Sequence, residues 1–141
     1  MSRMMATPHL AFADPAFTPV AQESELIADL VRPHFGDDGE WLTLFCFDAD
    51  ERLVAACENG GQHRTSVELT PTMVRAIIGS GHNGHILVAH NHPSGELRPS
   101  DDDIKLTRQL VDIGRLAGLT IADHLILTRA GHFSFRAAGL L

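Results

Sequence analysis

The sequence HILVAHNHPSG, residues 85–95, joins a run of apolar residues to a turn that contains proline and glycine. The run at 85–90 predicts a strand covered on both faces, because its apolar residues do not alternate with polar ones. Pro93 and Gly95 then turn the chain, and Ser100 is well suited to begin the helix that follows. This segment therefore predicts a strand whose polar end lies close to the first turn of a helix.

The segments on either side predict an α/β or α+β fold in which helices flank a mixed β-sheet. The first two strands are expected to form an antiparallel hairpin, with a loop at 58–61 after it. Helices are expected where apolar residues recur at helical spacing, at 22–35, 70–79 and 100–118. Strands are expected at 41–47, 52–57, 64–69, 85–90, 119–128 and 132–135.

The domain organisation expected from the sequence is simple. Residues 1–20 contain three prolines, which fix their own backbone and disfavour a helix before them, so this segment is expected to be a flexible arm. Residues 21–141 are expected to form a single domain, because a chain of 141 residues is long enough for one ordinary core.

The composition excludes several classes of protein. With 11 Lys and Arg against 18 Asp and Glu the formal charge is −7, which argues against direct DNA binding. Nine histidines against two cysteines favour nitrogen and oxygen ligands for any metal. There is neither a signal sequence nor an apolar run of the roughly 20 residues that span a bilayer, so a cytoplasmic protein is expected.

The spacing of His90, His92 and Asp103 points to a metal site. Side chains two residues apart in a strand lie on the same face, so both imidazoles can converge. Asp103 lies in the first turn of the following helix and can reach back towards them. Two imidazoles and a carboxylate are a typical ligand set for a catalytic Zn²⁺ with an open fourth position. Ser100 and Asp103 also match a capping box, so a purely structural role for this pair stays open.

These residues also resemble a known family. The order His90, His92, Pro93, then Ser100 and Asp103, is similar to the JAB/JAMM (MPN) metalloprotease motif. The string HNHPSG at 90–95 resembles the RadC branch of that superfamily, in a short, stand-alone form, and the likeness extends over about residues 40–141.

The resemblance implies a fold and a set of roles. The implied fold is a mixed sheet flanked by helices, with the layering of cytidine-deaminase-like proteins. The implied zinc ligands are His90, His92 and Asp103. Ser100 is implied as the hydrogen-bond donor that stabilises the tetrahedral intermediate. The family also uses an upstream glutamate as general base.

Two glutamates are candidates for that base. Glu58 is favoured because it is expected to end a strand and is soon followed by glycine, as in the family. Glu68 is the second candidate, and a site without a base is the third alternative. Without a base near the metal, the domain would bind zinc but not hydrolyse a substrate.

The resemblance thus implies a zinc-dependent peptidase or isopeptidase, acting on a peptide or protein, with a ubiquitin-like conjugate as one candidate substrate. The alternative is a non-catalytic zinc-binding interaction module with DNA-repair or mobile-element partners. Asp123 and His124 are adjacent in a predicted strand, so at most one of them can face the zinc. Cys46 and Cys57 are expected to be buried in the hairpin.

Overall fold

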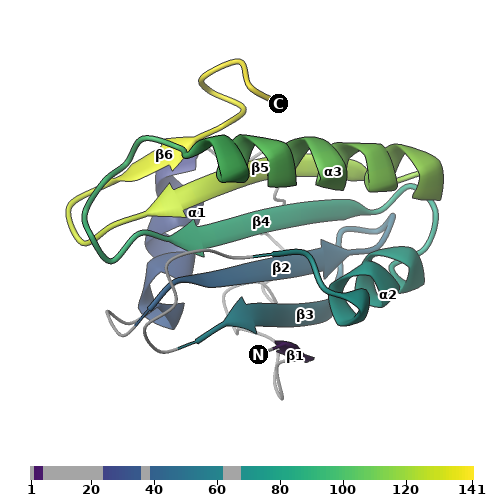
Figure 1. Cartoon of the computed structure of the whole chain (residues 1–141). Coiled ribbons are helices and arrows are strands. Elements are labelled where there is room, and N and C mark those ends of the chain that lie inside the picture. The colour runs from purple at the N-terminus through teal and green to yellow at the C-terminus, as the bar shows by residue number, and fades with distance from the viewer. Residues whose placement is uncertain (1, 5–23, 36–38, 62–67) are drawn as a thin grey trace.

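The structure is a computed structural model that describes residues 2–4, 24–35, 39–61 and 68–141 (Figure 1). Its elements in chain order are β1 (Ser2–Met4), α1 (Ser24–Val31), the 3-10 helix η2 (Arg32–His34), β2 (Trp41–Phe47), β3 (Leu53–Gly60), α2 (Pro71–Gly79), β4 (His85–Asn91), α3 (Asp101–Ala117), β5 (Thr120–Leu127) and β6 (His132–Ser134).

The described strands form one mixed sheet of six strands in the order β1-β3-β2-β4-β5-β6. All neighbours are antiparallel except β4 and β5, which are parallel and are joined by the helix α3. The predicted mixed sheet flanked by helices is therefore confirmed. Because β4 and β5 run in the same direction, their carboxyl ends lie at the same edge of the sheet. The antiparallel strand β2 begins at that edge, since Leu42 pairs with His90.

Helices cover both faces of the sheet, which makes three layers (Figure 1). On one face α1 contributes Ile27 and Val31 to a core that includes Phe45 and Leu125. On the other face, α2 and α3 pack on the core that contains Leu44 and Val88. The members that α2 and α3 contribute to that core are Met73, Ile77, Leu106 and Leu110. The absence of alternation in the sequence of β4 follows from this double coverage.

Local signals place the helix ends. The Thr70 side chain accepts a hydrogen bond from the Met73 amide at 3.3 Å, and Pro71 occupies the first turn of α2. Gly118 ends α3 in the left-handed conformation, with φ of 75°. None of the helices in the described residues has the length and apolar character needed to cross a membrane.

The structure departs from the sequence expectations in some segments and agrees with them in others. The loop predicted at 58–61 is wrong, because β3 continues to Gly60 and keeps pairing with Trp41. In the predicted flexible arm, residues 2–4 form β1 against β3, whereas residues 1 and 5–20 lie outside the described part of the chain. Of the strand predicted at 64–69, residues 64–67 also lie outside it, and residues 68 and 69 are not in a strand. Cys46 and Cys57 are buried, as expected.

Gly60 allows the end of β3 to approach the start of β2 closely. A Cβ at this position would overlap the Glu40 carbonyl oxygen and would lie 2.8 Å from the Trp41 Cα, and φ of Gly60 is 149°. Both features disfavour any residue with a side chain.

We expect Gly60→Ala to lower the free energy of unfolding by about 1–3 kcal/mol, because overlap with backbone atoms cannot be relieved by a change of rotamer. Urea denaturation of the metal-free protein measures this difference. The matched control is Gly79→Ala, since a Cβ at Gly79 meets nothing within 4 Å and Gly79 lies in a helix. The control should leave stability unchanged or raise it, by about 1 kcal/mol at most. Equal effects of the two variants would contradict the close approach.

Candidate metal centre

His90, His92 and Asp103 meet at the edge of the sheet where β4 ends. His90 Nδ1 lies 3.6 Å from Asp103 Oδ1, and His92 Nε2 lies 3.2 Å from Asp103 Oδ2. The two histidines leave the end of β4 on the side of α3, and Asp103 reaches back from the first turn of that helix. The structure thus brings together the three residues that the sequence proposed as ligands.

Glu40 is a fourth member of this group and was not among the residues predicted from the sequence. Its Oε2 lies 3.5 Å from His90 Nε2, and its side chain is 17% exposed. Potential ligand atoms of Glu40, His90 and His92 all lie within 4.8 Å of one another. Glu40 precedes Trp41, the first residue of β2, and so lies beside the end of the antiparallel strand β4.

Glu58 does not reach this group. It pairs with Thr43, which in turn pairs with Ala89, whereas His90 pairs with Leu42. Paired residues share a face of the sheet and adjacent residues lie on opposite faces, so Glu58 and His90 lie on opposite faces. The carboxylate that lies beside the histidines is therefore that of Glu40 and not that of Glu58.

The second candidate, Glu68, is exposed. Its backbone carbonyl accepts a hydrogen bond from Asn59 Nδ2 at 2.8 Å, and its carboxylate is not part of the group formed by Glu40, His90 and His92.

Asn91 holds the backbone on both sides of Glu40. Its Oδ1 accepts a hydrogen bond from the Trp41 amide at 2.7 Å, and its Nδ2 donates to the Gly39 carbonyl at 3.0 Å. The Gly61 amide donates to the carbonyl of Glu40 itself at 3.3 Å. The backbone at Glu40 is therefore held both by the side chain of Asn91 in β4 and by the residue that follows β3.

The hydrogen bond of the His92 ring selects its tautomer. His92 Nδ1 donates to the Glu96 carbonyl oxygen, because a carbonyl can only accept. In the neutral ring, Nε2 then carries a lone pair that faces the Asp103 carboxylate. The Nε2 lone pair and the carboxylate oxygen would repel each other at 3.2 Å, so a proton or a cation must lie between them. A hydrogen bond to the other ring nitrogen is also what orients histidines that bind metals.

His90 and Asp103 fit a metal ion for related reasons. His90 is fully buried, and neither of its ring nitrogens has a hydrogen-bond partner among the described residues. Burial alone would raise the pKa of Asp103, but the hydrogen bond from His92, the charge of His90 and the hydrogen bonds from Ser100 together hold it well below its ordinary value. An ionised carboxylate beside unpaired imidazole nitrogens is the donor set that a divalent transition metal prefers.

The His92–Asp103 contact also affects His92. Burial alone would lower the pKa of His92, but the hydrogen bond with Asp103, the Glu96 carbonyl and the charges of Asp103 and Glu40 together raise it above 6.5. In the protein without metal, a proton on His92 can therefore take the place of a cation.

Ser100 caps α3 through a capping box. Its amide donates to Asp103 Oδ2 at 2.9 Å, and its Oγ accepts from the Asp103 amide at 3.1 Å. These two bonds do not use the hydroxyl hydrogen of Ser100, which can still be donated. The capping box is thus compatible with a further hydrogen bond donated by the Ser100 hydroxyl.

His124 faces the same side of the sheet as the metal centre, and Asp123 faces the other. His124 Nδ1 lies 2.7 Å from Thr107 Oγ1, and its ring stacks on Phe135 at a centroid distance of 4.3 Å. Its ring centroid is 5.8 Å from that of His90. Asp123 instead accepts hydrogen bonds from the Ser134 hydroxyl at 2.6 Å and from the Arg136 amide at 3.0 Å.

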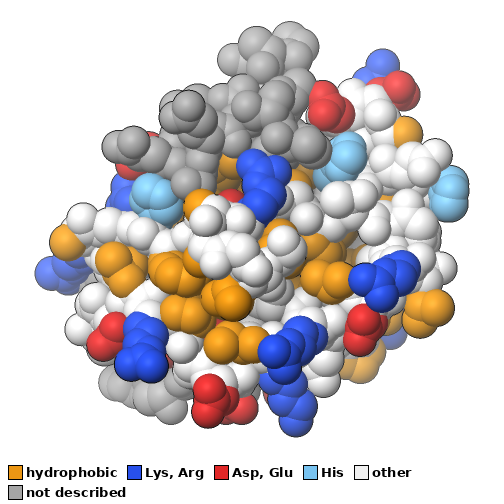
Figure 2. Space-filling view, turned by 90° about the horizontal axis from the view of Figure 1, so that it is seen from above, with side chains coloured by type: hydrophobic (Ala, Val, Ile, Leu, Met, Phe, Trp, Pro, Cys, Tyr) orange, Lys and Arg blue, Asp and Glu red, His pale blue; other side chains and the backbone are white. Residues whose placement is uncertain are grey.

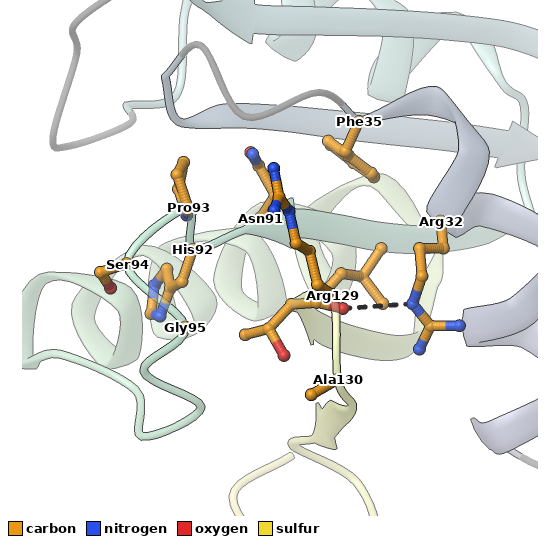
Figure 3. A pocket seen from close by; sticks show the side chains of 11 residues that line it. Arg32, Phe35, Asn91, His92, Pro93, Ser94, Gly95, Arg129 and Ala130 are labelled. Atoms are coloured by element: carbon orange, nitrogen blue, oxygen red, sulfur yellow. Dashed lines mark hydrogen bonds between the residues drawn. The ribbon is translucent and has the colours of Figure 1, made fainter.

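A cavity of about 580 Å³ opens beside His92 (Figure 3). It lies between the ends of η2, β4 and β5, and its lining includes Arg32, Phe35, Asn91, Thr128 and Arg129. It provides room for a ligand beside His92.

Comparisons with known proteins agree with this geometry. Residues 21–140 match the family model described as the RadC-like JAB domain. The chain is 53% identical over 105 residues to a UPF0758 protein of Chloroflexus aurantiacus, which is 73% of this chain and 45% of that protein. It is 33% identical over 121 residues to a UPF0758 protein of Acinetobacter baumannii, or 84% of this chain and 51% of that protein. The chain therefore spans about half the length of these curated relatives.

The buried His124 makes stability depend on pH. Burial, with a contribution from the charge of His90, lowers the pKa of His124 from 6.5 to about 3. Between these values the unfolded chain binds a proton that the folded protein does not, so stability falls as the pH falls from 6.5 towards 3. The slope that one such proton adds is at most about 1.4 kcal/mol per pH unit.

We expect His124→Gln to reduce this slope, as measured by urea denaturation of the metal-free protein between pH 6.5 and pH 4. His82→Gln, which changes an exposed histidine, is the matched control and should leave the slope unchanged. An unchanged slope in His124→Gln would contradict the burial of an uncharged imidazole at this position.

Proposed function

Because this chain belongs to the RadC-like JAB domain family, we propose that it is a zinc-dependent hydrolase of peptide or isopeptide bonds. The observation that carries the proposal is the position of the Glu40 carboxylate, 3.5 Å from His90 in a group that also contains His92 and Asp103. A carboxylate at this place can serve as the general base that hydrolysis by a metal-bound water needs.

The ligand roles proposed for His90, His92 and Asp103 rest on the donor set described above. Bound by two imidazoles and a carboxylate, zinc supplies a water molecule that ionises near neutral pH. The Glu96 carbonyl keeps the lone pair of His92 on Nε2, which faces Asp103. Ser100 holds one oxygen of Asp103 through its amide and so restricts the rotation of the carboxylate.

Glu40 is proposed as the general base. Its carboxylate accepts a proton from the attacking water and later returns it to the leaving amine. Asn91 keeps the backbone on both sides of Glu40 in place, so the carboxylate stays near the ligands. The Ser100 hydroxyl donates a hydrogen bond to the substrate carbonyl oxygen as negative charge develops there.

The proposed substrate is a peptide or protein in the cytoplasm, with a ubiquitin-like conjugate as one candidate. Binding to DNA is not part of the proposal. On the face shown in Figure 2, basic side chains alternate with acidic ones and do not form a continuous stripe, and the whole chain carries a formal charge of −7.

We predict that the variants separate zinc binding from hydrolysis. The wild-type protein should contain one zinc per chain, and His92→Ala and Asp103→Ala should lose it, because each removes one of three protein ligands. Glu40→Gln should keep the zinc and lower the rate of hydrolysis by about 10²–10⁴-fold, the usual contribution of a general base. Metal analysis measures the zinc content. Mass spectrometry of a proteome-derived peptide library, after incubation with each variant, measures hydrolysis.

The matched control is Glu58→Gln, since Glu58 lies at the same edge of the sheet but on the opposite face. It should retain both zinc and hydrolysis. Loss of zinc in Glu40→Gln together with its retention in Asp103→Ala would make Glu40 a ligand instead of the base. If wild type binds zinc but releases no products beyond those of Glu40→Gln, the non-catalytic interaction module is favoured.

A further inference from the structure

The cavity beside His92 has walls with different chemistry (Figure 3). Phe35, Pro93 and Leu127 supply apolar surface, and Arg32 and Arg129 supply two guanidinium groups. None of the described residues that line it is an aspartate or a glutamate. In a chain with a formal charge of −7, two guanidinium groups among the described residues of one cavity lining are a local exception.

Arg32 is held in place by its hydrogen bonds. Its Nε donates to the Thr128 carbonyl at 3.2 Å and its Nη2 to the Gly131 carbonyl at 3.4 Å, which ties η2 to the turn after β5. Its Nη1 lies 2.6 Å from Asp29 Oδ1, and the Asp29 side chain is 63% exposed. Arg32 therefore forms part of the cavity wall, and its charge is partly balanced by Asp29, which is not among the lining residues.

Arg129 reaches the cavity from the turn after β5. It is exposed and lies two residues beyond the end of β5 at Leu127, and in Figure 3 its side chain extends across the cavity towards Asn91. Asn91 and His92 are consecutive residues at the end of β4, so the guanidinium reaches a region next to the metal centre. A planar guanidinium with several donors suits the recognition of a carboxylate.

We propose that this cavity binds a carboxylate of the peptide substrate, with Arg129 as the specificity-determining residue. The apolar wall contacts the aliphatic part of the substrate, and the acidic end meets the guanidinium. The significance of this subsite for cleavage rests on the proposed function, since His92 belongs both to the cavity lining and to the metal centre. The carboxylate belongs either to an acidic side chain near the scissile bond or to the carboxyl end of the substrate chain.

Three pentapeptide probes distinguish these sources. The first has blocked ends and a central glutamate, the second has blocked ends and a central glutamine, and the third has a central glutamine and a free carboxyl end. Binding to the full ¹⁵N-labelled chain, with and without added zinc, is followed by chemical shifts of the backbone amides of residues 128–131 and of Arg129 Nε. Because binding is read directly, the result does not depend on whether the protein hydrolyses peptides.

At least one carboxylate probe should bind about fivefold more tightly than the blocked glutamine probe and shift these signals. Preference for the first probe identifies an acidic side chain, and preference for the third identifies a chain end. Arg129→Glu should abolish the preference, and Arg129→Lys should retain part of it. The matched control is Arg108→Glu, which makes the same charge change at an exposed position of α3 outside the cavity lining and should leave the preference unchanged.

Three results would overturn the inference. The first is equal binding of all three probes, or no binding by any of them. The second is a carboxylate preference that persists in Arg129→Glu. The third is an equal loss in Arg108→Glu, because the effect would then come from the overall charge of the protein and not from the cavity.

Discussion

The pairing of β4 with an antiparallel strand on one side and a parallel strand on the other is the constraint on which the site depends. This arrangement brings the start of β2, the end of β4 and the end of β5 to the same edge of the sheet. Glu40 comes from the first of these, His90 and His92 from the second, and Arg129 follows the third. The helix α3 must then cross back over the sheet to connect β4 with β5, so its first turn also lies near this edge.

Asp103 shows how one carboxylate can serve both the fold and the site. Oδ2 accepts a hydrogen bond from the Ser100 amide and faces His92, and Oδ1 faces His90. A cap alone would be satisfied with an exposed acid, yet Asp103 is only 5% exposed. Its burial next to two imidazoles would be costly without a positive charge, which a proton or a metal ion supplies. The carboxylate that caps α3 is therefore the same group that faces the two histidines.

The sequence could predict the residues of the site that lie close together along the chain, but not the one that lies far from them. His90, His92, Ser100 and Asp103 lie within 14 consecutive residues, so strand alternation and helix capping were enough to bring them together. Glu40 is 50 residues before His90 and meets it only because β2, and not β3, pairs with β4.

The error with Glu58 has the same origin. The glycine that follows it does lie at the correct edge, but Gly60 is there to accommodate the Glu40 carbonyl. The residue pattern of the hairpin located the edge correctly, and the unknown register concealed which face each glutamate occupies. An acidic residue immediately before the strand at 41–47 was the signal that could have identified Glu40, provided that the antiparallel pairing of that strand with 85–90 was also considered.

The charged groups along this edge are divided between two neighbouring sites. The carboxylates of Glu40 and Asp103 lie in the metal centre, where they would balance the charge of a bound divalent cation. The guanidinium groups of Arg32 and Arg129 lie in the adjacent cavity. Within the proposed function, the guanidinium groups favour the orientation of a peptide that keeps its acidic group in the cavity and presents a neutral carbonyl to the metal centre. Positive charge beside a charge-balanced metal centre can thus specify the orientation of a substrate even where each exposed ion pair contributes little affinity.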